Sequence, residues 1–542
     1  MLNSNGGKTA PCRAIAINHR AGKREMPVKR CIRLLTAVAI AITSAFTHSF
    51  ARDPYDRATD EAMPAATSGA LSVFSEMVMA AKHAAEGDSG YLLIDRNDMA
   101  LHWRLALIDS ATQSLDLQYY LWKGDAAGDL LGRRLIQAAD RGVRVRLLID
   151  DFLITGDGSD AAGIAEHPMM SIRFYNPWVN RGNRVVARAF EWLSRPDLNS
   201  RMHNKVLIDD NKVAIAGGRN IANEYFGLNS KKNFRDLDVV TVGPVVRDLS
   251  LAFDDYWTDD WVYPAQAVVK NHPEIDELAE LRERVMEIYG EERETLTSFP
   301  LEPRNWENEL AAMSGEMTFG PGLAVADDPN ETRGGTPDQV FMSLGMLVEE
   351  IQEELVIISA YFVPGERLVD YFDKLSHQGI RVIVLTNSLG SNNHAIANSQ
   401  YKKMRRALVE SGVELYEMRH DALLIDEVDT PPVQSQSLVL HSKAVMVDRK
   451  RAYIGGLNLS PRGILYNTEN GMIINDDEFA EQLALMLEKD IAPGNSWRVG
   501  LDENDRLYWE SDAGRVHRQP AQSGWQRAAD WFFGLFPLAN QI

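Results

Sequence analysis

The sequence predicts an α/β protein with two homologous halves, each a mixed, mainly parallel sheet flanked by helices. We expect a pseudo-two-fold axis between the halves and one shared active site. Three observations support this prediction. The chain has 542 residues, more than one ordinary hydrophobic core accommodates. Strand-like and helix-like segments alternate at the spacing of parallel strands with crossover helices. The same order of segments, together with one distinctive motif, returns later in the chain.

Residues 1–51 have the order of an export signal. A basic lead precedes the apolar run LLTAVAIAITSAF, and small residues follow at Ser49 and Ala51. The run is shorter than the roughly 18–20 residues that a membrane-spanning helix needs. We therefore expect a signal peptide and export to the bacterial cell envelope, as a periplasmic, membrane-associated protein. The alternative is that this N-terminal segment stays in place and anchors the protein in the inner membrane.

Residues 52–271 form the predicted N-terminal half. After an Ala-rich helical stretch, residues 89–111 indicate a strand, a turn and an amphipathic helix. SLDLQYYLW (residues 114–122) indicates a strand, residues 129–142 a helix that ends at Gly142, and residues 143–150 a further strand.

Residues 337–505 form the predicted C-terminal half and repeat this order. The expected elements are a helix at 340–352, a strand at 354–364, a helix at 366–379 and a strand at 380–387. Gly142 and Gly379 end corresponding helices at an offset of 379 − 142 = 237. Residues 272–336, charged and helical at first and then rich in Gly, Pro and Asp, are interpreted as a connection that holds a strand and a loop.

The C-terminal tail, residues 506–542, ends in the aromatic segment GWQRAADWFFGLFPLANQI. Trp and Phe on a short helix favour an interfacial membrane contact. A helix that docks on the protein's own core is an equally good interpretation.

The repeated motif carries the chemistry. The first copy is MHNKVLIDDNKVAIAGGRN and the second is LHSKAVMVDRKRAYIGGLN. Corresponding residues are 238 positions apart, as in 441 − 203, 448 − 210 and 458 − 220. Two copies in register make coincidence negligible. The motif residues are His203, Lys205, Asp210, Gly218 and Asn220 in the first copy, and His441, Lys443, Asp448, Gly456 and Asn458 in the second.

Spacing explains how these residues act together. On a strand, the His and Lys of H-x-K point to one face and enter one pocket. The Gly-Gly step allows close approach of a ligand or of the other half. Asn two residues later can donate to a phosphate oxygen. We therefore expect Gly218, Gly456, Asn220 and Asn458 to contact a substrate phosphate.

Paired H-x-K-x-x-x-x-D elements followed by a glycine pair and Asn resemble the phospholipase D superfamily. Segments such as SLDLQYYLW, RGVRVRLLIDD, GGRNIANEYFG, FRDLDVVTVGPVV and NTENG are similar to the C-type branch of bacterial cardiolipin synthases. The resemblance runs from about Ser89 to the C-terminus. Gly-Gly replaces the more common Gly-Ser in both copies, which removes a hydroxyl donor near the phosphate.

The resemblance implies a catalytic set of His203, Lys205, Asp210, His441, Lys443 and Asp448. It makes His203 the nucleophile that forms a phosphohistidine and His441 the acid and base, although the residues alone do not rank the two histidines. It also places Asp236 and Glu469 where a carboxylate orients a histidine ring. We expect Asp210 and Asp448 to tie down strand and turn. Two lysines take the part that a divalent metal has elsewhere, so neither a metal nor another cofactor is expected.

The resemblance implies a phosphatidyltransferase that makes cardiolipin from phospholipid. The expected partners are phosphatidylglycerol, with phosphatidylethanolamine as a second candidate, and a membrane surface. The alternatives are a phospholipase D that releases phosphatidic acid, a nuclease or other phosphodiesterase, and a scaffold without catalysis. A net charge of −20 argues against nucleic acid, and two intact motifs argue against a scaffold.

Other polar residues are interpreted as structural. The acidic run at residues 254–260 is expected to be a solvated helix face and loop rather than a cation site. Histidines without a counterpart in the repeat are expected to be ordinary structural residues; they include His102, His377, His394 and His420.

Overall fold

The structure is a computed structural model that describes residues 63–81, 85, 87–153, 159–178, 191, 195–269, 275–329 and 339–536. All of them belong to one compact unit, Asp56–Ile542. The expected signal peptide or anchor, residues 1–51, and the last residues of the tail, 537–542, lie outside the described residues. Within the described ranges, no helix has both the length and the apolar character needed to cross a membrane.

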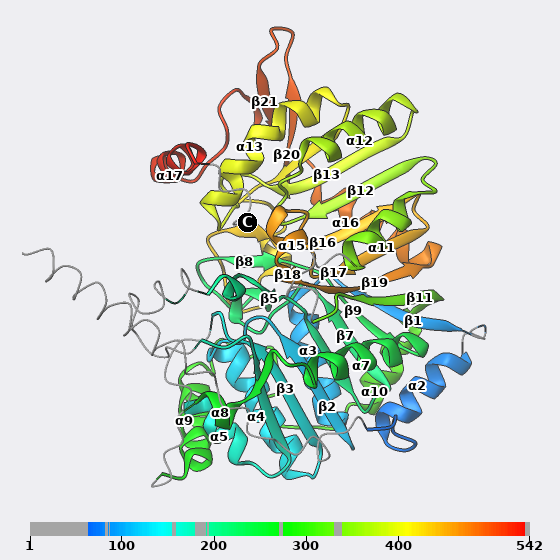
Figure 1. The fold of residues 1–542 in the computed structure, drawn as a ribbon, viewed down its shortest axis with the longest axis vertical. Helices are drawn as coiled ribbons and strands as arrows, with labels where there is room; N and C mark the ends of the chain where they lie inside the picture. Colours follow the sequence, from blue (N-terminus) through cyan, green and yellow to red (C-terminus); the bar gives the residue numbers. More distant parts are fainter. Residues whose placement is uncertain are drawn as a thin grey trace, which may run out of the picture. The chain divides into compact units, whose positions relative to one another are not determined.

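The N-terminal half has the predicted alternation of strands and helices (Figure 1). The strand, turn and helix predicted at residues 89–111, and the strands and helix predicted between 114 and 150, are confirmed. In chain order the elements are α2 (Ala70–Ala81), β1 (Asp88–Ile94), α3 (Asn97–Ser110), β2 (Ser114–Tyr119), α4 (Ala126–Asp140), β3 (Arg144–Asp150), α5 (Ser159–Glu166), β4 (Met170–Tyr175), β5 (Arg201–Met202), β6 (Val206–Asp209), β7 (Val213–Gly217), β8 (Asn233–Arg235), β9 (Asp238–Val242), α7 (Pro244–Trp257) and β10 (Val262–Pro264).

The C-terminal half repeats this order, and the four elements predicted between residues 340 and 387 are confirmed. Its elements are β11 (Thr318–Ala326), α11 (Gln339–Val348), β12 (Glu354–Ser359), α12 (Glu366–His377), β13 (Arg381–Asn387), α13 (Ala395–Glu410), β14 (Glu414–Met418), β15 (Leu438–Leu440), β16 (Lys443–Val447), β17 (Arg451–Gly455), α15 (Pro461–Leu465), β18 (Asn467–Thr468), β19 (Asn470–Asn475), α16 (Asp477–Asp490) and β20 (Ser496–Leu501). The hairpin β21 (Leu507–Ser511) and β22 (Gly514–Val516) and the helix α17 (Gly524–Gly534) follow.

One continuous mixed sheet runs through both halves. The N-terminal strands are ordered β10-β4-β3-β2-β6-β7-β9-β1. The C-terminal strands have the matching order β20-β14-β13-β12-β16-β17-β19-β11. β11 also pairs with β1 and so joins the halves. The segment interpreted as a connection therefore contributes the joining strand, and its helix α9 (Glu277–Glu291) packs against α4 and α5.

The prediction of a mixed sheet is confirmed, but the prediction that it is mainly parallel is wrong. Only β2-β3-β4 and β12-β13-β14 pair in parallel, and the other neighbours in this sheet are antiparallel. Helical crossovers impose parallel pairing at the outer strands. The motif strands β6-β7 and β16-β17 are instead joined by tight turns, which impose antiparallel pairing.

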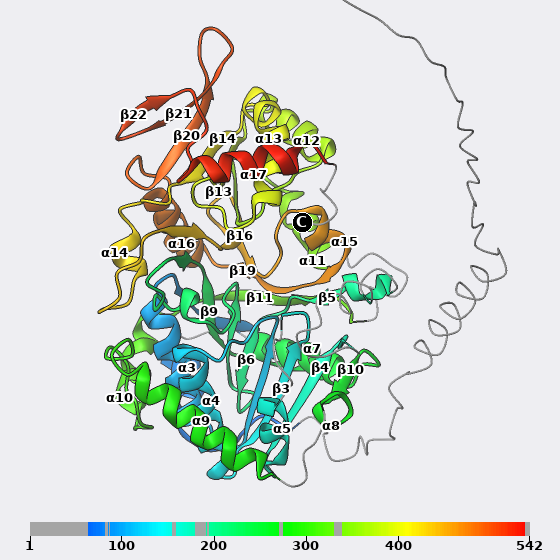
Figure 2. The same cartoon turned by 90° about the vertical axis from the view of Figure 1, so that its left-hand side faces the viewer.

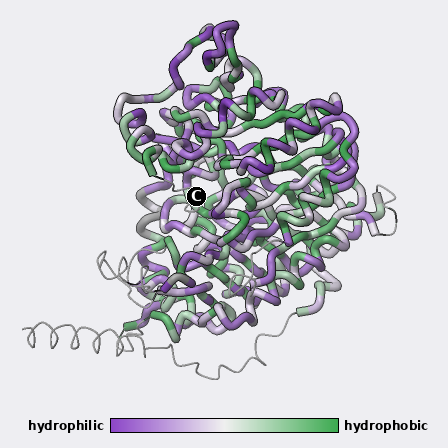
Figure 3. Tube along the Cα trace, turned by 45° about the horizontal axis from the view of Figure 1, so that its top comes forward, coloured by the Kyte–Doolittle hydropathy of each residue, from purple (hydrophilic) through white to green (hydrophobic). Residues whose placement is uncertain are grey.

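The two halves share a hydrophobic core. Strand residues of both halves, such as Ile208 and Met446, belong to one buried cluster together with residues of α7 and α16. The helices α3 and α4 cover the N-terminal sheet on another core, and α11 and α12 do the same for the C-terminal sheet. Hydrophobic stretches run through the middle of the chain trace, while many outer loops are hydrophilic (Figure 3). The shared core holds the motif strands of both halves in fixed positions.

The aspartate of each motif closes the turn after the motif strand. Asp210 has a positive φ of 52°, and its carboxylate accepts hydrogen bonds from Thr112 and from the backbone N–H groups of Gln113 and Ser114. Asp448, with φ 54°, accepts from three successive N–H groups, those of residues 352–354. This is the expected tie between strand and turn. Asp210 lies seven residues along the chain from His203, which is roughly 20 Å if the chain is extended. Asp210 therefore acts on the fold rather than at the histidines.

Replacing Asp210 by alanine should therefore destabilise the fold. The change leaves four donors without their acceptor and puts alanine in a left-handed conformation, which together should cost about 3 kcal/mol. Thermal unfolding followed by circular dichroism should show a lower midpoint for Asp210→Ala than for the wild type. The midpoint of Asp210→Asn should lie between those of the wild type and Asp210→Ala, because asparagine suits the left-handed region and keeps one acceptor. An unchanged midpoint would contradict the structural role.

Candidate active site

Each motif histidine follows a short strand that pairs with a strand of the opposite half. β5, which ends just before His203, pairs in parallel with β18, and the His203 N–H donates to the Thr468 carbonyl at 2.8 Å. β15, which ends just before His441, pairs in parallel with β8, and the His441 N–H donates to the Arg235 carbonyl at 2.8 Å. Each histidine is thus fixed by backbone from the opposite half.

This placement corrects the expectation that H-x-K lies within a strand. Residues 203–205 separate β5 from β6, and His441 precedes β16, which begins at Lys443. The histidine backbone leaves the main sheet because it is hydrogen-bonded to the other half. His203 and Lys205 still enter the same buried region.

A carboxylate from the opposite half holds each imidazole. The Glu469 Oε2 lies 2.8 Å from His203 Nδ1, and the Asp236 Oδ2 lies 2.6 Å from His441 Nδ1. Both carboxylates are fully buried. When Nδ1–H donates to such a carboxylate, Nε2 is the ring nitrogen left free to react.

The two lysines link the motifs electrostatically. Burial lowers the pKa of Lys205 to about 7 and that of Lys443 to about 8. The pKa of each histidine is lowered by burial and, in addition, by the positive charges of both lysines. Lys443 Nζ lies 2.8 Å from His441 Nδ1, and each lysine also hydrogen-bonds to the carbonyl of the histidine in its own motif. The structure therefore brings the two predicted motifs into one site.

The two carboxylates differ in the direction of their pKa shifts. Burial alone would raise the pKa of Asp236, but the positive charges of His441, Lys443 and Arg219 hold it well below its usual range. Arg219 also donates to the Asp236 carbonyl at 2.6 Å. The second copy has Leu457 in place of this arginine, and burial raises the pKa of Glu469 to about 8.

The motif glycines contact these carboxylates. A Cβ on Gly218 would lie 2.1 Å from Asp236 Oδ1, and a Cβ on Gly456 would lie 2.5 Å from Glu469 Oε2. Any larger residue would displace the carboxylate, which gives both glycines a steric reason independent of the predicted phosphate contact.

The motif asparagines differ in their freedom to bind a ligand. The Asn220 side chain accepts from the Leu121 N–H and donates to the Tyr225 hydroxyl. Asn458 Oδ1 accepts from the Tyr361 N–H at 3.4 Å, while its amide nitrogen has no hydrogen-bond partner among the described residues. The phosphate contacts expected of Asn220 and Asn458 stay predictions.

Several neighbours of the site have no clear signal in the sequence. The Tyr120 ring lies 4.9 Å from the His203 ring, and Phe234 stacks on His441 at 5.2 Å between centroids. Asp327, at the end of β11, accepts from the Glu469 N–H at 2.9 Å. The repeat could not identify them, because the repeated motif itself does not contain them.

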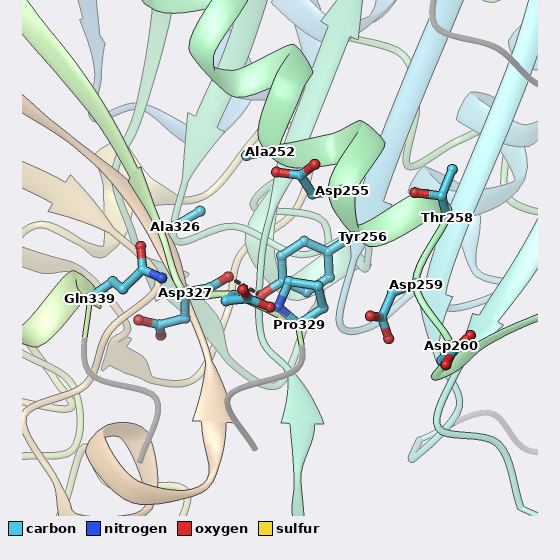
Figure 4. Close-up of a pocket in the computed structure, with 11 residues that line it drawn as sticks. Ala252, Asp255, Tyr256, Thr258, Asp259, Asp260, Ala326, Asp327, Pro329 and Gln339 are labelled. Atoms are coloured by element: carbon cyan, nitrogen blue, oxygen red, sulfur yellow. Dashed lines mark hydrogen bonds between the residues drawn. The ribbon is translucent and has the colours of Figure 1, made fainter. Parts of the chain in front are cut away.

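The acidic run lies elsewhere, beside a pocket of about 490 Å³ near the end of α7. Asp255, Asp259 and Asp260 line it together with Asp327, as Figure 4 shows, while Asp254 pairs with Arg146 at 2.8 Å. Neither catalytic histidine lines this pocket. In the described part of the chain, no cluster of three or more His, Cys, Asp or Glu could hold a metal ion.

Comparisons with known proteins agree with this architecture. The family model described as cardiolipin synthase, PLD-like domain, matches residues 105–257 and 347–491, one stretch in each half. Cardiolipin synthase C of Escherichia coli (strain K12) is 32% identical over 466 residues, which cover 83% of this chain and 96% of that protein. Cardiolipin synthase B of Shigella flexneri is 25% identical over 385 residues, or 69% and 74% of the two chains.

A solved structure shares the fold. The crystal structure of phosphatidylserine synthase from Haemophilus influenzae Rd KW20 matches with a TM-score of 0.50 and 18% identity, over 77% of this chain and 89% of that chain.

Proposed function

Because this chain belongs to the family of cardiolipin synthases with phospholipase D-like domains, and is therefore a phospholipase D-type phosphatidyltransferase, we propose that it makes cardiolipin through a phosphohistidine. The observation that carries the proposal is the pair of buried imidazoles, each held at Nδ1 by a carboxylate from the opposite half. The donor is a phospholipid and the acceptor is phosphatidylglycerol.

In the first step His203 Nε2 attacks the phosphorus of the donor. A P–N bond forms, the bond from phosphorus to the headgroup oxygen breaks, and the His441 imidazolium gives its proton to the departing alcohol. Lys205 and Lys443 stabilise the charge on the phosphoryl oxygens.

In the second step neutral His441 takes the proton from a hydroxyl of phosphatidylglycerol. That oxygen attacks phosphorus, the P–N bond breaks, and His203 returns to its neutral form. The product is cardiolipin. If water enters instead, the same groups release phosphatidic acid, so hydrolysis is the competing function.

The two carboxylates that hold the histidines differ in their electrostatic surroundings. His441 lies against Asp236, whose pKa is held low by positive neighbours and whose negative charge raises the pKa of His441 against burial. Burial and the positive charge of Lys443 outweigh this effect and lower the pKa of His441 to about 3, so the role of His441 as the acid rests on the family resemblance. Burial raises the pKa of Glu469 to about 8. Burial and the two lysines lower the pKa of His203, so the His203 ring stays neutral, as a nucleophile requires.

We expect the purified protein to convert acyl-labelled phosphatidylglycerol to cardiolipin, with or without phosphatidylethanolamine, and to do so equally well in EDTA. Thin-layer chromatography of the lipid products measures the outcome. Phosphatidic acid as the sole product would favour hydrolysis, and loss of activity in EDTA would overturn the metal-free mechanism.

A membrane location fits this substrate, and α17 supports it. The helix lies along α13, where Asp530 accepts a hydrogen bond from Asn398 at 2.6 Å (Figure 2). Its outward face is aromatic and apolar, with Trp525 80% exposed and Trp531 65% exposed. Such a face suits the interfacial region of a bilayer. We propose that α17 rests on the membrane of the cell envelope, after export directed by residues 1–51.

Replacing Trp525, Trp531 and Phe532 together by alanine should weaken binding to phosphatidylglycerol vesicles about tenfold, because each ring contributes apolar area at the interface. Sedimentation with vesicles measures this, on a chain that begins at Arg52 so that the N-terminal segment does not contribute. Leu423→Ala combined with Leu485→Ala removes exposed apolar side chains elsewhere and is the matched control. Equal binding of the two variants would contradict the proposal for α17.

A further inference from the structure

Two polar side chains lie one aromatic ring away from His441. Phe234 stacks on the His441 ring, and Lys232 Nζ lies 5.8 Å from the centre of the Phe234 ring. Tyr361 lies 6.4 Å from His441, and His394 lies 5.0 Å from Tyr361. Lys232 and His394 therefore approach the catalytic ring along two neighbouring aromatic side chains.

Both groups are available to bind a ligand. Among the described residues, the Lys232 ammonium has no ion pair or hydrogen bond, and the ring nitrogens of His394 have no hydrogen-bond partner. Lys232 is half-buried and His394 exposed, so solvent or a ligand can reach both. Partial burial of the His394 ring lowers its pKa, and the positive charge of Lys232 lowers it further, so the two side chains are close enough for their charges to interact. By contrast, Lys123 is paired with Glu224 at 2.7 Å.

The direction from which the acceptor attacks phosphorus indicates what this region could bind. In an in-line displacement the entering oxygen approaches phosphorus opposite the breaking bond. With phosphorus bonded to His203, the acceptor enters on the side of His441. Phosphatidylglycerol carries its own phosphate at the far end of a three-carbon glycerol chain. That second negative charge must therefore be accommodated beyond His441, where water or glycerol would place none.

We propose that Lys232 and His394 bind the phosphate of the acceptor phospholipid while Lys205 and Lys443 hold the phosphorus that is transferred. The inference rests on the proposed function and deepens it, since it names the contact that selects a phospholipid over water. The location of α17 agrees with it, because α17 packs on α13, which begins directly after His394, and Gln522 donates to the Gly390 carbonyl at 2.7 Å. An acceptor that comes from a membrane under α17 would meet this region first.

The repeat places no lysine at the position equivalent to Lys232. The β8 segment that follows Lys232 corresponds to β18, because Asp236 and Glu469 hold the two histidines at an offset of 469 − 236 = 233. The position equivalent to Lys232 is then 232 + 233 = 465, which is Leu465. Lys232 therefore has no counterpart in the repeat, although a different cation, Arg462, lies close enough to His203 for its positive charge to lower the pKa of that histidine.

The test separates the acceptor from the donor. Full-length protein is given phosphatidylglycerol labelled in its headgroup, so that release of labelled glycerol measures the first step. Either glycerol or glycerophosphoglycerol, which carries the headgroup phosphate without acyl chains, is then supplied as acceptor. Lys232→Ala should lower transfer to glycerophosphoglycerol and cardiolipin formation about tenfold, while transfer to glycerol and hydrolysis stay within about twofold. His394→Ala should shift the products in the same direction, and Lys232→Arg should restore transfer.

Lys231→Ala is the matched control, because it removes an equal charge from the neighbouring exposed residue. Equal loss with all acceptors, an unchanged choice of acceptor, or the same change in Lys231→Ala would each overturn the inference and leave the proposed function standing. A wild-type protein that forms only phosphatidic acid would overturn the proposed function and this inference with it.

Discussion

Replacing His203 by alanine is expected to abolish turnover of phosphatidylglycerol, with a loss of roughly 10⁴-fold or more. In the proposed mechanism the alanine removes the atom that forms the P–N bond, while the lysines are held to the histidine carbonyls and the carboxylates to the rings. The variant should also take up no label from a donor labelled at phosphorus. Acid-quenched protein, digested and analysed by mass spectrometry, measures the phosphohistidine directly.

His377→Ala is the control for this experiment, because His377 lies on the exposed surface of α12 and should leave activity unchanged. Glu469→Gln should fall between the two, since it keeps the shape of the side chain but weakens the hold on His203 Nδ1. A phosphorylated His203→Ala protein, or one with more than about a hundredth of wild-type turnover, would show that another group is the nucleophile.

The repeat predicted which residues form the site, because equal spacing identifies equivalent positions whatever the fold. His203 and His441 were identified in this way, whereas the carboxylates of Asp236 and Glu469 were identified only through the resemblance to the phospholipase D superfamily. Local periodicity likewise predicted the strands and helices of both halves, since burial on one face imposes it along the chain.

Contacts between the halves are what the sequence could not specify. The hydrogen bonds from His203 to Thr468 and from His441 to Arg235 join residues more than 200 positions apart, and they take the histidines out of the strands where H-x-K was expected. The antiparallel majority of the sheet depends on which strand lies beside which, and periodicity does not encode that. The same holds for β11, which was interpreted as part of a connection and joins the halves.

The sequence differences between the two motif copies affect the site as well as the residues that the copies share. Leu457 stands at the position equivalent to Arg219. The positive charges of His441, Lys443 and Arg219 hold the pKa of Asp236 below its usual range, whereas burial raises that of Glu469 to about 8. Two identical imidazoles in a symmetric field would be equally suited to either role. We expect this difference to contribute to the separate roles proposed for the two histidines.

The proposed roles of the two histidines predict an asymmetric response to the leaving group. His441→Ala should lose roughly 10³–10⁴-fold in turnover of phosphatidylglycerol, because the departing glycerol alkoxide then has no proton donor. A phosphodiester with a nitrophenol leaving group needs no such donor, so its first step should stay within about tenfold of wild type. The second step still needs His441 as base. The variant should therefore release about one nitrophenol per protein in a burst and then stall.

The stalled protein should carry its phosphoryl group on His203, which peptide mass spectrometry can identify. Asp236→Asn should weaken the same two steps to a smaller degree, since His441 remains but loses the charge that favours its imidazolium. The double variant His203→Ala, His441→Ala should give no burst, which shows that the released nitrophenol depends on His203. If His203→Ala alone gave the burst and His441→Ala did not, the two roles would be exchanged, and the charge difference between Asp236 and Glu469 would have to act in the opposite direction.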